Sequence, residues 1–330
     1  MSELRQDLVS GDWTILAPKR AKRPHDWGKG KPKRAKSPKT TCPFEDLEKS
    51  GNEPIELFPP SDDWKIAVIP NKYPALEAKN VCPDGKKKGP YSVIEGFGHH
   101  ELVITRDHDR NLPKMTSREA VELFRVFKHR LNVLSQDPCG DYSTLWHAWG
   151  PSAGATIYHP HYQILTLPIV PPDIRQSFEG SVRYFRKYKK CVHCVMLAYE
   201  KKCKNRIIYE NKYAIAMAPF VSRQPFEVRV FPKKHFSHFE KTSDVALSGA
   251  VEALSVALGR ISERLGDPDY NFFLHTAPFQ KAEEYKMYHW HMEVIPKLSL
   301  LGGFEWSTGI DINTVDPDMA AKVLRGKKFK

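Results

Sequence analysis

The sequence predicts an α+β fold built from two tandem halves, each an antiparallel sheet with a packed helix. The first observation is an internal repeat: Tyr142 and Tyr270 lie 128 residues apart, and His159 and His289 lie 130 apart. The second is that both halves follow the order strand, helix, strand, loop and a strand with a His-x-His motif. The third is that no glycine-rich phosphate-binding motif follows a strand, which disfavours P-loop and dinucleotide-binding folds.

The expected strands follow from apolar or alternating runs between turn residues. In the first half they lie near Trp13–Leu16, Trp64–Ile69, 98–104, 141–147 and 158–170. In the second half they lie near Arg206–Tyr209, 225–232, 269–275 and 288–296. The 330 residues are enough for two ordinary domains, which we place at 1–178 and 179–330.

One helix is expected in each half. Thr116 begins the first, because Glu119 three residues later completes a capping box and apolar residues follow at helical spacing. Thr242 or Ser243 begins the second, where apolar residues recur at the same spacing. Each helix therefore presents one apolar face that can pack on its sheet.

The most informative motif is His159-Pro160-His161-Tyr162-Gln163, which follows a loop of small residues at 152–156. Alternate residues of a strand point the same way, so His159, His161 and Gln163 share one face. An imidazole there can attack phosphorus, and the amide can donate to a phosphoryl oxygen. The simpler interpretation is a polar strand face, but the glutamine, the loop and the repeat favour phosphate chemistry.

The second copy of the motif, His289-Trp290-His291-Met292-Glu293, ends on a carboxylate. An ionised glutamate at the position of Gln163 would repel an incoming phosphate. We therefore expect only the first copy to be catalytic. The second copy would serve as scaffold, metal site and part of a sugar pocket.

Composition indicates a soluble globular protein, with 41% hydrophobic and 27% charged residues. We find no apolar run long enough to span a membrane and no secretory leader at Met1, so the expected compartment is the cytoplasm. Much of the net charge of +12 comes from Lys19–Lys39, which holds ten Lys or Arg residues. A nucleic-acid-binding arm is one interpretation. We favour a solvated loop whose first arginines reach an anionic ligand, because Trp27 is the only aromatic residue there.

The six cysteines do not indicate a disulfide framework in a chain of this size without a leader. Cys191 and Cys194 have the close spacing that metal sites use. A redox Cys-x-x-Cys motif is the alternative, but such a motif usually opens a helix after a strand. We therefore favour a metal site at this pair.

Several segments together resemble the galactose-1-phosphate uridylyltransferase family of the histidine-triad superfamily, of which ADP-glucose phosphorylase is a close relative. The similarity runs nearly the whole length, through Trp13–Pro24, Pro70–Leu76, His159–Gln163 and Gly302–Glu305. The stretch Phe304–Gly309 is also similar to the phosphorylase. The resemblance implies two tandem histidine-triad-like halves. It also implies a homodimer, because some sugar contacts in this family come from the other subunit.

The resemblance implies roles for individual residues. His161 would be the nucleophile, and Gln163 would hydrogen-bond the transferred phosphate. The implied nucleotide and phosphate contacts are Arg20, Arg23, Asn71, Gly154 and Thr156, and the implied sugar contacts are Phe304 and Glu305.

The resemblance also implies zinc at two sites. The first would use Cys42, His100 and His159, with Glu45 where the family has a second cysteine. The simpler interpretation of Cys42 alone is a buried small apolar residue. The second site would use Cys191, Cys194, His235 and His289, and this closed set would be structural.

The activity that the resemblance implies is exchange of UMP between UDP-glucose and galactose 1-phosphate, by a ping-pong route through a uridylyl-histidine. Ala148 departs from the family, which usually has an asparagine eleven residues before the first motif histidine. The nucleotide and the leaving group are therefore open, and ADP-glucose phosphorylase is the main alternative. A histidine-triad hydrolase is a weaker one, and a nucleic-acid-binding module is weaker still.

Overall fold

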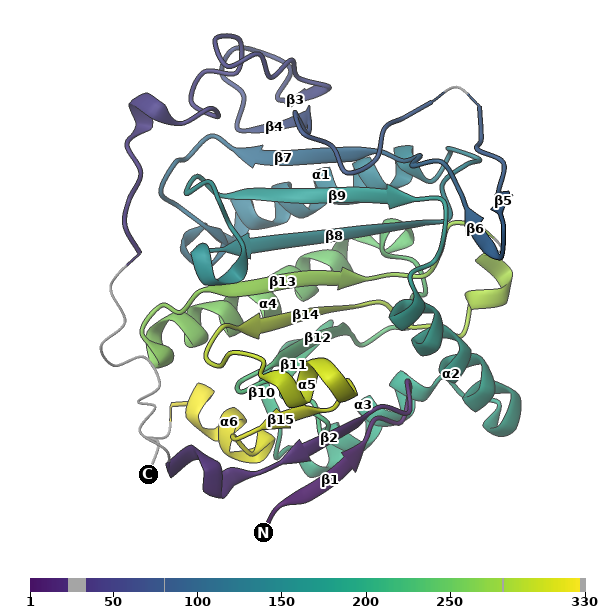
Figure 1. The fold of residues 1–330 in the computed structure, drawn as a ribbon. Coiled ribbons are helices and arrows are strands. Elements are labelled where there is room, and N and C mark those ends of the chain that lie inside the picture. The colour runs from purple at the N-terminus through teal and green to yellow at the C-terminus, as the bar shows by residue number, and fades with distance from the viewer. Residues whose placement is uncertain (23–33, 80, 281, 327–330) are drawn as a thin grey trace.

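The fold is that of a computed structural model, which describes residues 1–330 except 23–33, 80, 281 and 327–330. Its main feature is a ten-stranded antiparallel sheet (Figure 1). The strands of this sheet are β3 (Glu56–Phe58), β4 (Ile66–Pro70), β7 (His100–Thr105), β8 (Tyr142–Trp149), β9 (His161–Leu167), β10 (Ile207–Glu210), β11 (Ala214–Met217), β12 (Val228–Pro232), β13 (Tyr270–His275) and β14 (His291–Pro296).

Two smaller sheets and six α-helices complete the described part of the chain. The first small sheet contains β1 (Glu3–Gln6), β2 (Trp13–Leu16) and β15 (Asp311–Asn313), and the second contains β5 (Lys86–Lys88) and β6 (Tyr91–Val93). The helices are α1 (Ser117–Leu134), α2 (Pro172–Tyr188), α3 (Val192–Cys203), α4 (Asp244–Leu265), α5 (Gly303–Thr308) and α6 (Pro317–Leu324).

The order of strands in the large sheet shows the duplication. The first half contributes β3-β4-β7-β9-β8, and the second contributes β10-β11-β12-β14-β13, so the order in one half mirrors that in the other. The two halves meet where β8 pairs with β13, and Ala148 lies opposite Asn271 there. The predicted α+β class is confirmed. The boundary that we placed after residue 178 falls within α2, and the independence of the two halves stays a prediction.

Helices α1 and α4 pack on one face of the sheet (Figure 1). Thr116 and Glu119 form the predicted capping box of α1, and Ser243 is the residue before α4. Phe127 of α1 packs on the fully buried Tyr162 of β9, with ring centroids 5.1 Å apart. Because side chains alternate along β9, burying Tyr162 on this face directs its neighbours to the other face.

Helix α4 corrects one expectation from the sequence. Its 22 residues are long and apolar enough to cross a membrane by length and composition, although we expected no such run. In the fold its apolar residues, among them Leu247, Leu254 and Leu258, are buried in the core between the sheet and α1. This environment explains the composition of the helix.

Three further features were not predicted. The N-terminal β2 pairs in parallel with β15, so the two ends of the chain meet on the second half. Helices α2 and α3 follow the first half directly. Cys82 and Cys139 form a disulfide that links the segment before β5 to the turn after α1, although no disulfide framework was expected. The cysteines Cys42, Cys191, Cys194 and Cys203 are free.

Candidate active site

The second histidine of the motif lies at the start of a central strand. β9 begins at His161, and Gln163 lies on the same face, opposite to the face that Tyr162 occupies. This face carries a second apolar cluster, in which Phe44 and Ile104 are buried. His159 precedes the strand and does not belong to its alternation.

The His161 ring is held with one nitrogen available. Its Nδ1 donates to the backbone carbonyl of His159 at 2.9 Å, the kind of acceptor that a histidine nucleophile requires. Among the described residues, none forms a hydrogen bond with Nε2. Burial lowers the pKa of His161, although the bond to the carbonyl opposes this effect. The ring is therefore neutral at neutral pH, and its lone pair lies on Nε2. The residue keeps 7% of its surface exposed.

His147 supports His161 from the neighbouring strand, and the sequence did not indicate it. Its Nδ1 donates to the backbone carbonyl of His161 at 2.7 Å, and its ring stacks on Tyr162 at 4.3 Å. Burial lowers the pKa of His147 to about 3, so this residue is neutral. A single core histidine has no spacing signal, because only the strand pairing reveals its partner.

Gln163 is oriented by a short hydrogen-bond network. The backbone N–H of Ala75 donates to Nδ1 of His100 at 3.1 Å, so Nε2 of His100 carries the proton. That Nε2 donates to Oε1 of Gln163 at 3.0 Å. Nδ2 of Asn71 lies 3.1 Å from the same Nε2 of His100. Because the oxygen of the Gln163 amide is occupied, its NH₂ group remains to donate to a ligand.

The structure does not place His100 with the other predicted ligands of the first metal site. The group that gathers near His161 contains His108 instead, together with Cys42, Glu45 and His159. Their donor atoms all lie within 4.8 Å of one another. Nδ1 of His159 is 3.6 Å from Sγ of Cys42 and 3.3 Å from Oε1 of Glu45. Nδ1 of His108 is 2.9 Å from the same oxygen.

The histidines of this group are prepared for a metal. Nε2 of His159 donates to the carbonyl of Thr105 at 2.6 Å, and Nε2 of His108 donates to the carbonyl of Ser37 at 2.9 Å. Both Nδ1 lone pairs consequently face the other donors, which is the usual arrangement around zinc. One thiol, one carboxylate and two imidazoles fit this metal, so the residues present match the implied cofactor.

The second predicted metal group is brought together completely. Cys191, the residue before α3, converges with Cys194, His235 and His289. Sγ of Cys194 is 3.5 Å from Nδ1 of each histidine, and Nε2 of His235 donates to the carbonyl of Lys286 at 2.8 Å. The hydrogen bond between the two cysteines lowers the pKa of Cys191 and raises the pKa of Cys194. The cysteine pair lies at the start of helix α3, as in a redox Cys-x-x-Cys motif, but a helix and not a strand precedes it.

The loop of small residues before the motif is anchored by Asp269. Oδ2 of Asp269 accepts from the backbone N–H and the hydroxyl of Ser152 at 2.8 and 2.6 Å, and Oδ1 accepts from Arg34 at 2.7 Å. Gly150 has φ +88° and a Cβ there would lie 1.9 Å from Oδ1, so only glycine fits. The predicted Gly154 and Thr156 lie exposed on this loop, with open space around Gly154.

The remaining predicted contacts lie apart from His161. Arg20 is exposed in a turn at 18–22, and Arg23 lies outside the described residues. Phe304 and Glu305 belong to α5, where Phe304 is 42% exposed and Glu305 accepts from the backbone N–H of Gly302. In the described part of the chain, neither Phe304 nor Glu305 contacts His161 of the same chain.

The second copy of the motif differs from the first in charge. Burial alone would raise the pKa of Glu293, but Arg229 and Arg223 lower it well below its usual value. Both arginines form ion pairs with this carboxylate at 3.1 Å. His275 and His291 also lie beside it. In the second copy, the position of Gln163 is therefore occupied by an ionised carboxylate that two arginines hold in place.

The comparison with protein families agrees with these features. A family model described as "Galactose-1-phosphate uridyl transferase, N-terminal domain" matches residues 1–171, and a model described as "Domain of unknown function (DUF4921)" matches 97–326. The chain belongs to the galactose-1-phosphate uridylyltransferase family. The predicted family is thereby confirmed.

Individual family members resemble the chain over nearly its whole length. ADP-glucose phosphorylase of Arabidopsis thaliana is 36% identical over 98% of this chain and 92% of its own. Galactose-1-phosphate uridylyltransferase of Thermotoga maritima is 28% identical over 98% of both chains. The crystal structure of the Arabidopsis ADP-glucose phosphorylase with bound ADP-glucose matches all of both chains with a TM-score of 0.85 and 32% identity.

Proposed function

We propose that this protein transfers a nucleoside monophosphate from a nucleotide sugar to a phosphate acceptor through a covalent bond to His161. The observation that carries this proposal is the bond from Nδ1 of His161 to the carbonyl of His159. It places the proton on Nδ1 and leaves Nε2 as the nucleophile. The carbonyl also stabilises the positive charge that the ring gains when Nε2 forms its new bond.

The reaction consists of two displacements at the same phosphorus. Nε2 of His161 attacks the α-phosphorus, a P–N bond forms, and the P–O bond to the sugar phosphate breaks. The leaving group departs as hexose 1-phosphate and needs no proton. A phosphate oxygen of the acceptor then attacks, the P–N bond breaks, and the neutral ring returns. The NH₂ group of Gln163 and the loop with Gly154 and Thr156 stabilise the equatorial oxygens.

The donor that we favour is ADP-glucose, with inorganic phosphate as acceptor. The 36% identity to an ADP-glucose phosphorylase over 98% of the chain supports this choice. The exchange of UMP between UDP-glucose and galactose 1-phosphate, which the motifs alone suggested first, is the second candidate. The match of the uridylyltransferase family model to residues 1–171 supports it.

Zinc and a second subunit complete the proposal. Cys42, Glu45, His108 and His159 would hold one zinc ion, and Cys191, Cys194, His235 and His289 would hold another. Zinc would supply rigidity by fixing the segments that carry these ligands. We also propose a homodimer in which Phe304 and Glu305 reach the sugar in the partner's site. The exposure of Phe304 on α5 and the separation of both residues from His161 in the same chain support this.

Intact-mass measurement tests the function directly. The protein is incubated separately with ADP-glucose and UDP-glucose, and an added mass of AMP or UMP identifies the donor. We expect AMP on the wild-type chain and no adduct on His161→Asn. Release of the adduct by phosphate, and not by galactose 1-phosphate, would identify the phosphorylase. An adduct that persists on His161→Asn would exclude this mechanism.

A further inference from the structure

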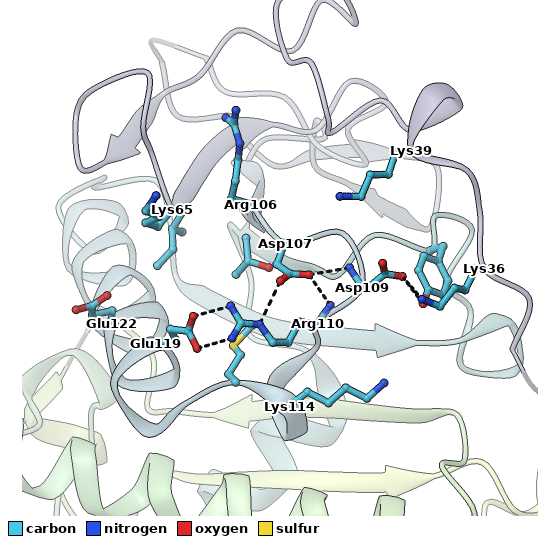
Figure 2. A pocket seen from close by; sticks show the side chains of 14 residues that line it. Lys36, Lys39, Lys65, Arg106, Asp107, Asp109, Arg110, Lys114, Glu119 and Glu122 are labelled. Carbon is cyan, nitrogen blue, oxygen red and sulfur yellow. Dashed lines mark hydrogen bonds and ion pairs between the residues drawn. The ribbon is translucent and has the colours of Figure 1, made fainter.

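A cavity of about 750 Å³ lies beside the candidate active site, near the end of β7 and the start of α1 (Figure 2). The side chains that line it come from the segment after residue 33, from β4 and the residue before it, from β7 and the segment that joins it to α1, from α1, and from the segment before β9. The charged members are Lys36, Lys39, Lys65, Arg106, Asp107, Asp109, Arg110, Lys114, Glu119 and Glu122. A volume of this size is typical of sites for small molecules.

The negative charges of the cavity are already paired. Asp107 and Glu119 form ion pairs with Arg110 at 3.2 and 2.6 Å, and Asp109 forms one with Lys36 at 3.0 Å (Figure 2). The carboxylate of Glu122 pairs with Arg118, which does not line the cavity. Asp107 and Glu119 share the single positive charge of Arg110, and the six cations and four carboxylates of the lining together leave a net charge of +2.

Four of the lining cations have no such partner. No carboxylate of the described residues forms an ion pair with Lys39, Lys65, Arg106 or Lys114, although the guanidinium of Arg106 lies over the ring of Trp64. Figure 2 shows these four side chains around the cavity without dashed lines. Their combined field attracts a ligand with more than one negative charge.

Thr105 also lines the cavity, and its buried hydroxyl has no partner among the described residues. Thr105 is 7% exposed, and its Oγ1 has no hydrogen-bond partner in the described structure. A buried hydroxyl that stays unpaired has a free-energy cost, which an acceptor oxygen of a ligand removes. Ile66, Met115 and Tyr158 supply an apolar wall beside it. A sugar phosphate matches this lining, because its phosphate suits the cations and the hydroxyl and its sugar suits the apolar wall.

The cavity is distinct from the catalytic face. Thr105 alternates with Ile104, which packs with Phe44 on the face of His161, so the Thr105 side chain points to the α1 face. The two sites are nevertheless connected through the backbone. The carbonyl of Thr105 accepts from His159, whose own carbonyl accepts from His161. A ligand in the cavity therefore lies two hydrogen bonds from the nucleophile.

We propose that this cavity is a second binding site, for a small phosphorylated metabolite that is not the substrate. Lys39, Lys65 and Lys114 attract its phosphate, the Thr105 hydroxyl donates to it, and Tyr158 and Met115 contact its body. Occupation braces the loop 105–110 and the His159 carbonyl behind the nucleophile.

Calorimetric titration tests the site with glucose 6-phosphate and, separately, with inorganic phosphate. The protein is His161→Asn saturated with ADP-glucose, so that the catalytic pocket is filled and no turnover occurs. We expect one glucose 6-phosphate per chain and weaker binding of inorganic phosphate, which lacks the body. Adding Lys65→Ala and Lys114→Ala should weaken binding by roughly tenfold or more, because both cations are exposed and unpaired and their loss leaves the fold intact.

Two further variants make the result specific. Thr105→Val keeps the shape of the side chain and removes the hydroxyl, and we expect it also to weaken binding. Lys201→Ala with Lys202→Ala removes the same charge from the exposed end of α3 and should leave binding unchanged. Absence of binding, or equal weakening by both lysine pairs, would overturn the proposal. Because the catalytic adduct is measured separately, failure here leaves the proposed function untouched.

Discussion

At the scale of single residues, the amide of Gln163 depends on one neighbour for its direction. An amide can present either its oxygen or its NH₂ group to a ligand, and only the NH₂ group can stabilise a phosphoryl oxygen. His100 resolves this choice, because its Nε2–H occupies the oxygen at 3.0 Å. We therefore regard His100 as a positioning residue that acts through Gln163.

Replacing His100 by phenylalanine removes this constraint and should slow formation of the nucleotidyl-His161 adduct by roughly tenfold to a hundredfold. His100→Gln can still donate to the Gln163 oxygen and should recover much of the rate. The measurement is single-turnover mass labelling, with the melting temperature as a check of the fold. If both variants lose the same rate, His100 has only a packing role.

The assignment of His100 also shows where sequence reasoning reached its limit. The sequence predicted a metal group from Cys42 and His159, and the structure places these two together. It could not distinguish His100 from His108, because the choice depends on how the loop after β7 turns back to Glu45. The sequence also could not predict that His100 is the partner of Gln163, because Ala75 and Asn71, which contact His100, belong to a different segment.

At the scale of elements, the pairing of β8 with β13 places an asparagine opposite Ala148, the position where the resemblance implied one. This residue is Asn271, which lies directly opposite on the adjacent strand. With its amide oriented to suit both neighbours, Asn271 donates to the carbonyl of Ala153 at 3.0 Å and accepts from Lys297 at 3.1 Å. An amide therefore contacts the loop of small residues at 152–156, although it comes from the second half of the chain.

We predict that Asn271→Ala loosens the loop and lowers the rate of adduct formation by roughly tenfold, about the effect of one lost hydrogen bond. Adding Ala148→Asn returns an amide across the strand pair, where opposite Cβ atoms lie about 5 Å apart. We expect the double variant to recover most of the rate in the same labelling assay. A double variant slower than Asn271→Ala alone would show that the two positions are not equivalent.

The strands themselves were largely predictable, but their neighbours were not. The alternating pattern and the repeat located β7, β9, β12 and β14, because one face of each strand is buried against a helix. The pairing of β2 with β15 joins segments nearly 300 residues apart, and no local pattern encodes it. The contact between Ala148 and Asn271 likewise exists only because the two halves form one sheet.

At the scale of the whole molecule, the two metal groups fasten peripheral segments to equivalent places in the repeat. His159 and His289 each lie two residues before the second histidine of their motif, and each belongs to one group. The first group holds the segment around Cys42 against the first half. The second holds the start of α3 against the second half. Only the first adjoins the proposed nucleophile, because the carbonyl of His159 accepts from His161.

Metal removal should therefore affect the halves differently. Elemental analysis is expected to give two zinc ions per chain, falling to one in Cys191→Ser with Cys194→Ser. That variant should melt at a lower temperature but keep its rate of adduct formation, because its metal group does not contact the first motif.

Cys42→Ser should lose the other ion and also slow adduct formation, since His159 is then less firmly held. Strong chelation of the wild-type chain should combine both effects. Two ions retained in Cys191→Ser with Cys194→Ser would contradict the second site, and an unchanged rate in a Cys42→Ser chain without its ion would separate the first site from catalysis.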